Sequence, residues 1–408
     1  MTVRSSNPDR SLAWRARNGI VAPRRTVERR GAARRMVVAA VAVVSVAVGI
    51  AALSIDGGRA AAQRAALAAT SPPALARSDS AAFLRRYLAA DGRVVRHDQG
   101  GDTVSEGQAY AMLLAVATRQ ATEFASAWHW DQAHLQQPDG LFSYYWSHGA
   151  VADAQPASDA DIDTAWALVL AARRFGNPTY LAEGRAVAAA VLSNETVTVA
   201  GKLELVAGPW AVTGPAVVNP SYLAPEAMTA LATATGDPRW SELATSITLL
   251  VTGLTATSPA RLLPDWVQVL PNGMVRPVGA ANGAGVPAYG LNAERAPVWL
   301  SASCAAADRT TAARQWTVLQ RADHQGAEIA YTLSGGTITT QVNPLGSVAA
   351  AAAAGAAGHV QDAASLLSRA DQQSDRFHTY YGDAWTALGR VLLETDWLSP
   401  CPSIPSGT

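Results

Sequence analysis

The chain has 408 residues, of which 49% are hydrophobic and 16% charged, so disorder over its whole length is excluded. Its formal net charge of +0 hides an asymmetry, because residues 1–35 hold 10 of the 32 basic residues but only 2 of the 32 acidic ones. The remainder therefore carries 22 basic and 30 acidic groups. A body this acidic excludes nucleic acid as the expected partner, since phosphate binding needs clustered Lys and Arg.

The first predicted element follows the basic segment 1–35, which is expected to stay in the cytoplasm. Residues 36–55 form a run of 20 without a charge, with Arg35 before it and Asp56 after it. Such a run is long enough to span a bilayer as a helix. A cleaved signal peptide is the alternative, because small residues at 60–62 permit cleavage. Either interpretation places the rest of the chain outside the cytoplasm, as a single-pass membrane protein or a secreted one.

The remaining chain predicts a linker at 56–78, which is rich in Ala, Ser and Pro, then one all-α domain at 79–400 and a tail at 401–408. Gly, Pro and Asn separate the helix-type segments. Helices are expected at 80–90, 105–121, 159–175, 179–193, 222–235, 238–254, 292–307, 345–370 and 379–396, with β-prone stretches at 196–206 and 336–343. Paired helices suit a toroid of helical hairpins, whose long loops at one end would build the site.

Two cysteines, Cys304 and Cys401, are too few for a disulfide scaffold or a four-ligand metal site. In an oxidising compartment they could pair and tie the C-terminal tail to the domain. Two unpaired buried thiols are the alternative, because the sequence does not give their separation.

The first loop of chemical interest precedes the segment 105–121, which is expected to be amphipathic. Ser105 with Gln108 predicts a capping box, so a helix should begin there with Glu106 in its first turn. Acidic residues also favour helix N-termini through the helix dipole alone. Glu106 is therefore either a residue with a chemical role or an acidic residue that only stabilises the start of a helix.

The second loop opens another predicted helix with Asp159, Asp161 and Asp163. Helical spacing puts Asp159 and Asp163 on one face and points Asp161 elsewhere. Three carboxylates exceed what capping needs. A calcium cluster is one explanation, although the Gly and Glu of an EF-hand loop are absent, and a catalytic carboxylate held by its neighbours is another.

The third and fourth loops combine proline with large aromatic residues. They contain Gly208-Pro209-Trp210, the run from Asn219 to Pro225, and Pro264-Asp265-Trp266. Proline beside Trp or Tyr fixes an aromatic ring on a stiff loop. Taken singly, each of these is equally well explained by ordinary loop packing.

Together these loops, in this order, resemble glycoside hydrolase family 8 over about residues 80–396. The matching stretches are Ser105–Gln108, 157–175, Asn219–Tyr222, Pro264–Trp266 and Tyr380–Trp385, although Thr164 stands where the family has Ile or Met. The resemblance implies an (α/α)6 barrel with a glycan cleft across its loop-bearing end. It also implies a β-glycan as partner, most readily a cellulose-like β-1,4-glucan. Neither a cofactor, a metal nor an oligomer is indicated, so we expect a monomer.

The resemblance also implies roles for individual residues in an inverting hydrolase. Glu106 matches the general acid, and Asp159 matches a carboxylate close to the sugar at the cleavage point. A helix N-terminus would lower the pKa of Glu106, so burial or a nearby carboxylate must raise it. Residues expected to bind substrate are Trp130, Trp146, Trp210, Tyr222, Asp265, Trp266 and Arg295.

The sequence departs from the family at the general base. Many members carry the base in a Tyr-Asp-Ala-x-Arg segment, and Asn292 stands at the aspartate position here. An amide does not take a proton from water at neutral pH, so Asn292 cannot act as a base. Glu294, Asp265 and Asp102 are possible substitutes, which would make a chitosanase-like or lichenase-like enzyme. The alternative is a membrane-tethered module that binds glycan without cleaving it.

Overall fold

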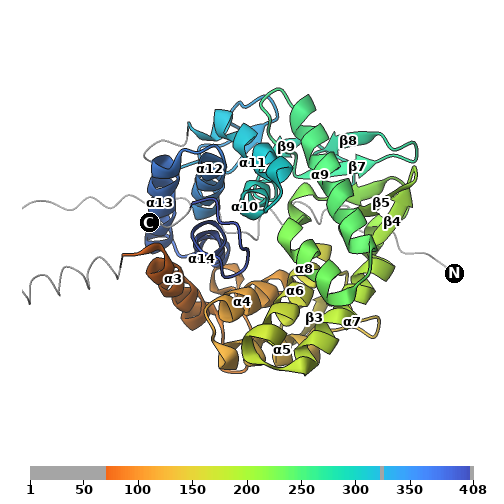
Figure 1. Cartoon of the computed structure of the whole chain (residues 1–408), viewed down its shortest axis with the longest axis vertical. Coiled ribbons are helices and arrows are strands. Elements are labelled where there is room, and N and C mark those ends of the chain that lie inside the picture. The colour runs from red at the N-terminus through yellow and green to blue at the C-terminus, as the bar shows by residue number, and fades with distance from the viewer. Residues whose placement is uncertain (1–69, 322–325, 405–408) are drawn as a thin grey trace, which may run out of the picture.

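The computed structural model describes residues 70–321 and 326–404, which form a ring of antiparallel helical hairpins (Figure 1). Each hairpin places one helix on the inside of the ring and one on the outside, and adjacent inner helices contact one another around the ring. This is the arrangement expected of an (α/α)6 barrel, so the helical fold predicted from the sequence is confirmed.

In the described part of the chain, six helices form each layer. The inner helices are α4 (Ser105–Ala117), α6 (Ser158–Phe175), α8 (Pro225–Thr235), α10 (Arg295–Ala302), α12 (Pro344–Ala356) and α14 (Tyr380–Glu394). The outer helices are α3 (Pro72–Tyr87), α5 (Ala121–His134), α7 (Pro178–Asn194), α9 (Arg239–Thr257), α11 (Ala306–Leu319) and α13 (Val360–Arg376).

The inner helices are largely buried, because one side packs on the outer layer and the other faces the centre of the ring, although α8 leaves Thr229 and Thr233 exposed. Every residue of α4 and α14 is buried, as is nearly every residue of the Ala-rich α12. The expectation of an amphipathic helix at 105–121 was therefore wrong. Real amphipathic patterning belongs to the outer layer, where α13 buries one face through Ala363, Leu366 and Leu367.

The capping box predicted at the start of α4 does not form. Val104 is the N-cap and provides no side-chain cap. Gln108 instead accepts a hydrogen bond from the backbone N–H of Val94 and donates to the carbonyls of Gly92 and Ala127. A fully buried amide must satisfy its own polar atoms, and here it does so by fastening a neighbouring turn rather than by capping the helix.

Short strands occur in the loops between the helices, all antiparallel. They are β1 (Thr103–Val104), β2 (Tyr145–Ser147), β3 (Ala150–Asp153), β4 (Thr196–Val199), β5 (Lys202–Leu205), β6 (Ala216–Val218), β7 (Trp266–Val269), β8 (Val275–Val278), β9 (Ala288–Tyr289) and β10 (Tyr331–Thr332). The β-prone stretch 196–206 forms the β4–β5 hairpin as predicted. The stretch 336–343 forms only isolated bridges.

The ring closes where the first and last described helices meet, α3 against α14. Arg390 of α14 is buried and bonds Asp79 of α3 at 2.9 Å, Glu394 at 2.7 Å, and Asp371 of α13. Burial, helped by Asp371, raises the pKa of Asp79 to about 7 despite the opposing charge of Arg390. One guanidinium thus holds three carboxylates from three helices together.

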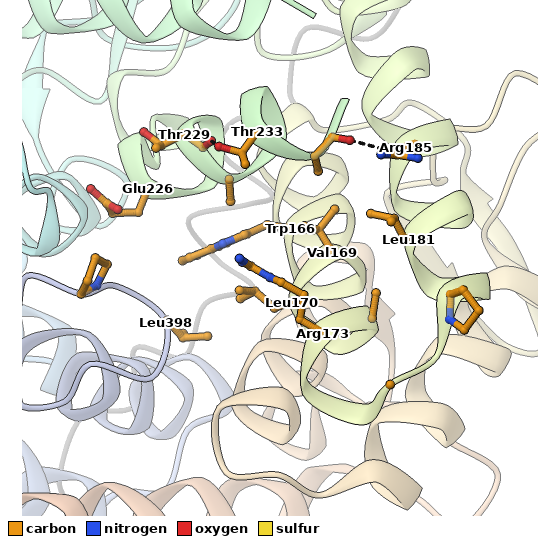
Figure 2. A pocket seen from close by; sticks show the side chains of 16 residues that line it. Trp166, Val169, Leu170, Arg173, Leu181, Arg185, Glu226, Thr229, Thr233 and Leu398 are labelled. Carbon is orange, nitrogen blue, oxygen red and sulfur yellow. Dashed lines mark hydrogen bonds between the residues drawn. The ribbon is translucent and has the colours of Figure 1, made fainter. Parts of the chain in front are cut away.

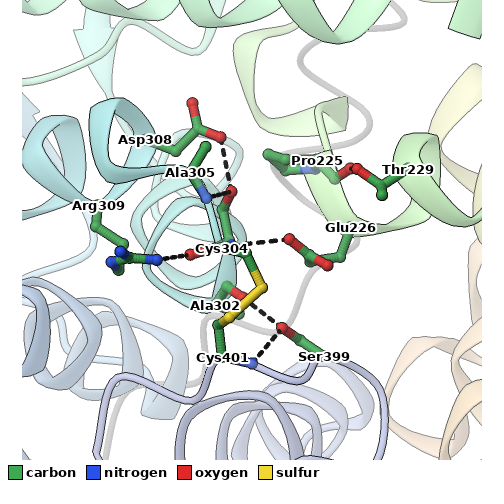
Figure 3. Close-up of a disulfide and its surroundings, with 11 residues drawn as sticks. Pro225, Glu226, Thr229, Ala302, Cys304, Ala305, Asp308, Arg309, Ser399 and Cys401 are labelled. Atoms are coloured by element: carbon green, nitrogen blue, oxygen red, sulfur yellow. Dashed lines mark hydrogen bonds between the residues drawn. A yellow bond between two sulfur atoms is a disulfide. The ribbon is translucent and has the colours of Figure 1, made fainter. Parts of the chain in front are cut away.

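A disulfide joins Cys304, just after α10, to Cys401, with Cα atoms 5.2 Å apart (Figure 3). Of the two alternatives left open by the sequence, the structure has the paired cysteines. Glu226 accepts a hydrogen bond from the N–H of Cys304, and Ser399 Oγ donates to the carbonyl of Ala302. The segment after α14 is thereby fastened to the base of α10.

The predicted ends of the domain are shifted in the structure. The helix α3 begins at Pro72, inside the expected linker 56–78. At the other end, the expected tail 401–408 contains Ile404, which is buried and donates its N–H to Leu393. The predicted membrane span 36–55 lies outside the described residues. Within residues 70–321 and 326–404, none of the helices combines the length and apolar character needed to cross a bilayer.

Candidate active site

The N-termini of several inner helices converge at one end of the ring, and the residues expected from the sequence to carry chemistry lie there. Glu106 is in the first turn of α4, Asp159 is in the first turn of α6, and Arg295 begins α10. All three are buried, with exposed fractions of 7%, 7% and 2%. The fold therefore brings together residues separated by 189 positions in the sequence, from Glu106 to Arg295.

Arg295 links the two carboxylates through a single nitrogen. Its Nη1 lies 2.7 Å from Oδ2 of Asp159 and 3.7 Å from Oε2 of Glu106. The same nitrogen donates to the hydroxyl of Tyr110 at 3.2 Å. Asp159 thus has the short, charge-assisted bond, and Glu106 has only a longer electrostatic contact.

The second guanidinium nitrogen of Arg295 fixes the other side of the cluster. Nη2 donates to Ser221 Oγ at 2.8 Å and to Asn292 Oδ1 at 3.3 Å. The guanidinium carbon also lies 5.1 Å from the ring centre of Tyr222, within cation–π range. Arg295 was expected to bind substrate. The structure adds that it organises the surrounding side chains.

The pKa of Glu106 is raised to about 7, first by burial and then by the charge of Asp159, while Arg295 and Arg96 act in the opposite direction. Burial or a nearby carboxylate had to outweigh the helix dipole, which lowers the pKa of Glu106, and both are present. A carboxylic acid with a pKa of about 7 keeps its proton near neutral pH and can still release it.

The three aspartates at the start of α6 point in the predicted directions, with Asp159 and Asp163 on one face and Asp161 on another. Asp163 lies one turn beyond Asp159, and burial raises its pKa well above the usual value. Asp161 points away from the cluster and accepts a hydrogen bond at 2.8 Å from the N–H of Phe142. It therefore holds the loop after α5 against α6.

Asn292 lies beside Arg295 and is 3% exposed, so the structure puts an amide in the Arg295 cluster at the position where the family aspartate was expected. Glu294, two residues further along, points elsewhere. Its side chain is fully buried, and neither of its oxygens has a hydrogen-bond partner among the described residues. Burial, and then the charge of Asp265, raise its pKa well above the usual value. A carboxyl so enclosed is poorly placed to activate water.

The two other carboxylates proposed as substitute bases each have a structural partner. Asp102 forms a two-point ion pair with buried Arg96, at 2.6 and 2.8 Å. Asp265 accepts hydrogen bonds from the N–H groups of Gly290 and Ala293, both at 2.9 Å. Asp265 therefore holds the loop that carries Asn292, and it is 5% exposed.

The predicted stacking residues differ in exposure. Trp130 is 4% exposed and stacks on His134 with ring centres 4.5 Å apart, so its expected role as a glycan platform is corrected to core packing. Trp146 of β2 is half-buried and meets Trp130 edge to face. Trp210 is 38% exposed, and its Nε1 donates to the carbonyl of Pro156.

Tyr222 and Trp266 form an edge-to-face pair, with ring centres 6.1 Å apart, next to Arg295. Tyr110 and Ser221 complete the cluster, and no role was assigned to them from the sequence. Tyr110 lies four residues after Glu106, so helical spacing alone would have indicated that both face the same side.

A family model of the glycosyl hydrolases family 8 matches residues 60–395. A probable endoglucanase of Novacetimonas hansenii is 32% identical over 226 residues, which is 54% of this chain and 65% of the relative. An endoglucanase of Cellulomonas uda is 30% identical over 241 residues, 56% of this chain and 64% of the relative. The chain thus spans a little less than two thirds of the length of these curated relatives.

Solved structures resemble the whole described domain. An endo-beta-1,4-glucanase from Acetobacter xylinum is 25% identical with a TM-score of 0.66, covering 79% of this chain and 98% of that one. A beta-1,3-1,4-glucanase from Paenibacillus sp. X4 is 20% identical with a TM-score of 0.70, covering 79% and 92%, and supports the fold alone. Because the family model matches most of its length, and because its fold is the helical ring described above, this chain belongs to the glycosyl hydrolases family 8.

Proposed function

We propose that the protein is an endo-acting hydrolase of a β-glucan, cellulose-like β-1,4-glucan first, that works by inversion outside the cytoplasm. The observation that carries the proposal is the buried Glu106, with a pKa of about 7, beside the Asp159–Arg295 ion pair. The name endoglucanase, borne by several relatives, supports the class of substrate.

Glu106 is the general acid in this proposal. Cleavage of a glycosidic bond needs a proton on the departing oxygen, and a carboxylic acid supplies it best when its pKa lies near the working pH. The enclosure of Glu106 and the negative charge of Asp159 both keep that proton in place before the reaction.

Asp159 positions charge and substrate rather than activating water. Because Nη1 of Arg295 lies 3.7 Å from Glu106 Oε2 and 2.7 Å from Asp159 Oδ2, these two oxygens are at most about 6.4 Å apart. Inverting hydrolases separate their acid and base by roughly 6.5–9.5 Å to admit a water molecule. This proximity to Glu106 and the short ion pair with Arg295 favour a positioning role for Asp159 over that of the base.

Asp102, Asp265 and Glu294 remain the candidate bases, as proposed from the sequence. Asp265 holds the loop that carries Asn292, Asp102 is paired with Arg96, and Glu294 is enclosed. Asp265 is the best supported of the three, because its loop leads directly to the Arg295 cluster. Removing its carboxylate would also release that loop, so the Asp265 variant needs a measurement of stability beside the rate.

Work outside the cytoplasm is supported by two features. The basic segment 1–35 followed by the uncharged run 36–55 is typical of an exported or membrane-anchored chain. The disulfide between Cys304 and Cys401 suits an oxidising compartment, since cytosolic thiols are kept reduced.

The variant Glu106→Gln tests the proposal. It preserves the shape of the side chain but removes the transferable proton, so hydrolysis of carboxymethylcellulose should fall by about 10²–10⁴-fold while glucan binding persists. Glu204→Gln is a matched control, because Glu204 is also a buried glutamate with a raised pKa but belongs to the β4–β5 hairpin outside the Arg295 cluster. A Glu106→Gln protein with full activity would overturn the role of Glu106.

A second candidate function, glycan binding without efficient cleavage, is favoured by Asn292. Asn292→Asp adds a carboxylate 3.3 Å from Arg295 Nη2, where the guanidinium would keep it ionised. If the base has been lost, this variant gains reducing-end release from β-glucan or chitosan, and the gain disappears when Glu106→Gln is added. If the base is elsewhere, the wild type is already active and Asn292→Asp gives no gain. An inactive wild type that neither binds glycan nor responds to Asn292→Asp would contradict both functions.

A further inference from the structure

The helical ring has a second end, opposite the candidate active site, where the inner helices finish. The helices α4 and α6 have 13 and 18 residues, so their two ends are roughly 20 and 27 Å apart. At their C-terminal ends lie Arg119, just after α4, and Arg173 and Arg174, in the last turn of α6, which we call the basal arginines. Arg119 and Arg173 are exposed, and Arg174 is half-buried.

The basal arginines form a cluster of like charge. The pKa of Arg174 is lowered first by burial and then by the charges of Arg119 and Arg173, with only Asp396 acting in the opposite direction among the main contributors. The helix dipole accounts for Arg173 and Arg174, which lie in the last turn of α6. It does not account for Arg119, which follows a different helix and has a φ of 63°.

An aromatic residue lies among these charges. Arg174 Nη2 donates to the carbonyl of Trp397 at 2.9 Å, and the guanidinium carbon of Arg77 lies 4.8 Å from the Trp397 ring centre. Trp397 is half-buried. Tryptophan among arginines is typical of a protein surface that meets the interfacial region of a membrane.

A mostly apolar pocket of about 700 Å³ adjoins the basal arginines. Figure 2 shows Leu170, Arg173 and Leu398 around this pocket, which is formed by α6, α7, α8 and the segment after α14. Arg173 thus belongs both to the cluster and to the pocket wall. An apolar hollow beside basic groups has the chemistry of a phospholipid, with a charged head and an apolar chain.

The chain also enters the domain on this side. The helix α3 begins at Pro72, and Arg77, in its second turn, contacts Trp397. The predicted membrane span ends at residue 55, so residues 56–71 would connect it to α3. A coil of 16 residues has an average reach of roughly 20–25 Å, which is less than the roughly 27 Å length of α6. The basal side is therefore the side brought to the bilayer.

Building on the membrane-anchored form of the proposed function, we propose that the basal arginines and Trp397 dock on anionic phospholipids of the bilayer that would hold the anchor, with the adjoining pocket open to the apolar part of the lipid. Neutral β-glucan offers no charge for these arginines to bind. The candidate active site at the opposite end would then face away from the membrane, toward polysaccharide.

The test uses the full-length protein reconstituted in vesicles, with a specific protease site engineered into residues 60–66. After cleavage, the domain should remain with vesicles of phosphatidylcholine that contain about 30% phosphatidylglycerol at low salt, and leave them at about 0.5 M salt. It should leave vesicles of phosphatidylcholine alone at either salt concentration. Equal retention on both lipids, or release from both, would overturn the proposal.

The variant R119Q/R173Q/R174Q should lower the partition coefficient onto the anionic vesicles roughly a hundredfold. Its rate of glucan hydrolysis should equal that of the wild type, which also shows that it folds. The double variant R119Q/R173Q changes exposed side chains only, so it decides the outcome if the triple variant is unstable, with an expected loss of roughly tenfold or more. A partition coefficient like that of the wild type would refute the role of these arginines.

A matched control changes the same number of charges elsewhere. Arg276, Arg314 and Arg369 lie on β8, α11 and α13, outside the basal cluster. The variant R276Q/R314Q/R369Q should keep the partition coefficient within about threefold of the wild type. A hundredfold loss in this control would show that net charge, rather than the basal face, determines binding.

Discussion

The raised pKa of Glu106 predicts a specific response to Asp159→Asn. Burial is the larger cause of that raised pKa, and the charge of Asp159 is the second. Replacing Asp159 with an amide removes the negative charge but leaves Arg295 in place, so Arg295 favours the ionised form of Glu106 with only burial left to oppose it. The pKa of Glu106 should therefore fall. The alkaline limb of the pH–activity profile, where Glu106 loses its proton, should move to lower pH.

The size of the effect follows from the distances around Arg295. With the two carboxylate oxygens at most about 6.4 Å apart and an effective dielectric constant near 20, their repulsion before relaxation is at least about 2.6 kcal/mol. That energy corresponds to roughly two pH units in the position of the alkaline limb. Relaxation and water entering the site reduce the repulsion, so we expect the limb to move from about pH 7 to about pH 5–6.

The assay is the pH dependence of kcat/KM, which reports the free enzyme, measured on soluble β-glucan from about pH 4 to 9. Asp163→Asn is the matched control, because Asp163 is also a buried aspartate of α6 but is not among the main groups that shift Glu106. It should leave the alkaline limb where it is. An alkaline limb that stays near pH 7 or rises in Asp159→Asn would refute the electrostatic account.

Three further predictions concern stability. The Cys304–Cys401 disulfide closes a loop of 97 residues, so Cys304→Ala with Cys401→Ala should lower the free energy of unfolding in urea by about 2–5 kcal/mol. Asp79 has its pKa raised to about 7, so the folded state binds the extra proton and stability should fall as the pH rises from about 4 to 7. Asp79→Asn should flatten that part of a melting-temperature profile, whereas an unchanged slope would contradict it. A Cβ on Gly107 would lie 2.9 Å from the Tyr380 hydroxyl, so Gly107→Ala should cost about 1–3 kcal/mol in the same urea assay and weaken activity.

Helices bounded by Gly or Pro were predictable from the sequence, and those without such boundary residues were not. Pro178 and Gly176 bound α6 and α7 as expected. The segment 345–370 was predicted as one helix, but the chain turns at Gly358, with a φ of 83°, so two helices form. The helices α5 and α11 were missed because their polar residues obscure the apolar stripe, and their helical state depends on packing against α4 and α10.

The candidate site was predictable residue by residue, but its electrostatics were not. Glu106, Asp159 and Asn292 were identified from motifs, and the structure brings all three to Arg295. The sequence indicated that burial or a nearby carboxylate must raise the pKa of Glu106 against the helix dipole, but it could not say which, and burial is the larger cause because all of α4 lies inside the ring. Such burial depends on how the helices pack together, which the sequence does not show directly. Helix packing also buries Trp130, which was expected to bind substrate but lies in the core.

The meeting of α3 with α14 makes the domain a structure that can be completed only at the end of synthesis. These helices are separated by almost the whole described chain, and contacts between distant segments form slowly because a long loop must close first. Until α14 has emerged, α3 and the buried inner face of α4 lack their partner. Under the export proposed above, the ring would still be open while the chain crosses the membrane. The order of the helices along the chain would then be enough to make export precede the completion of folding.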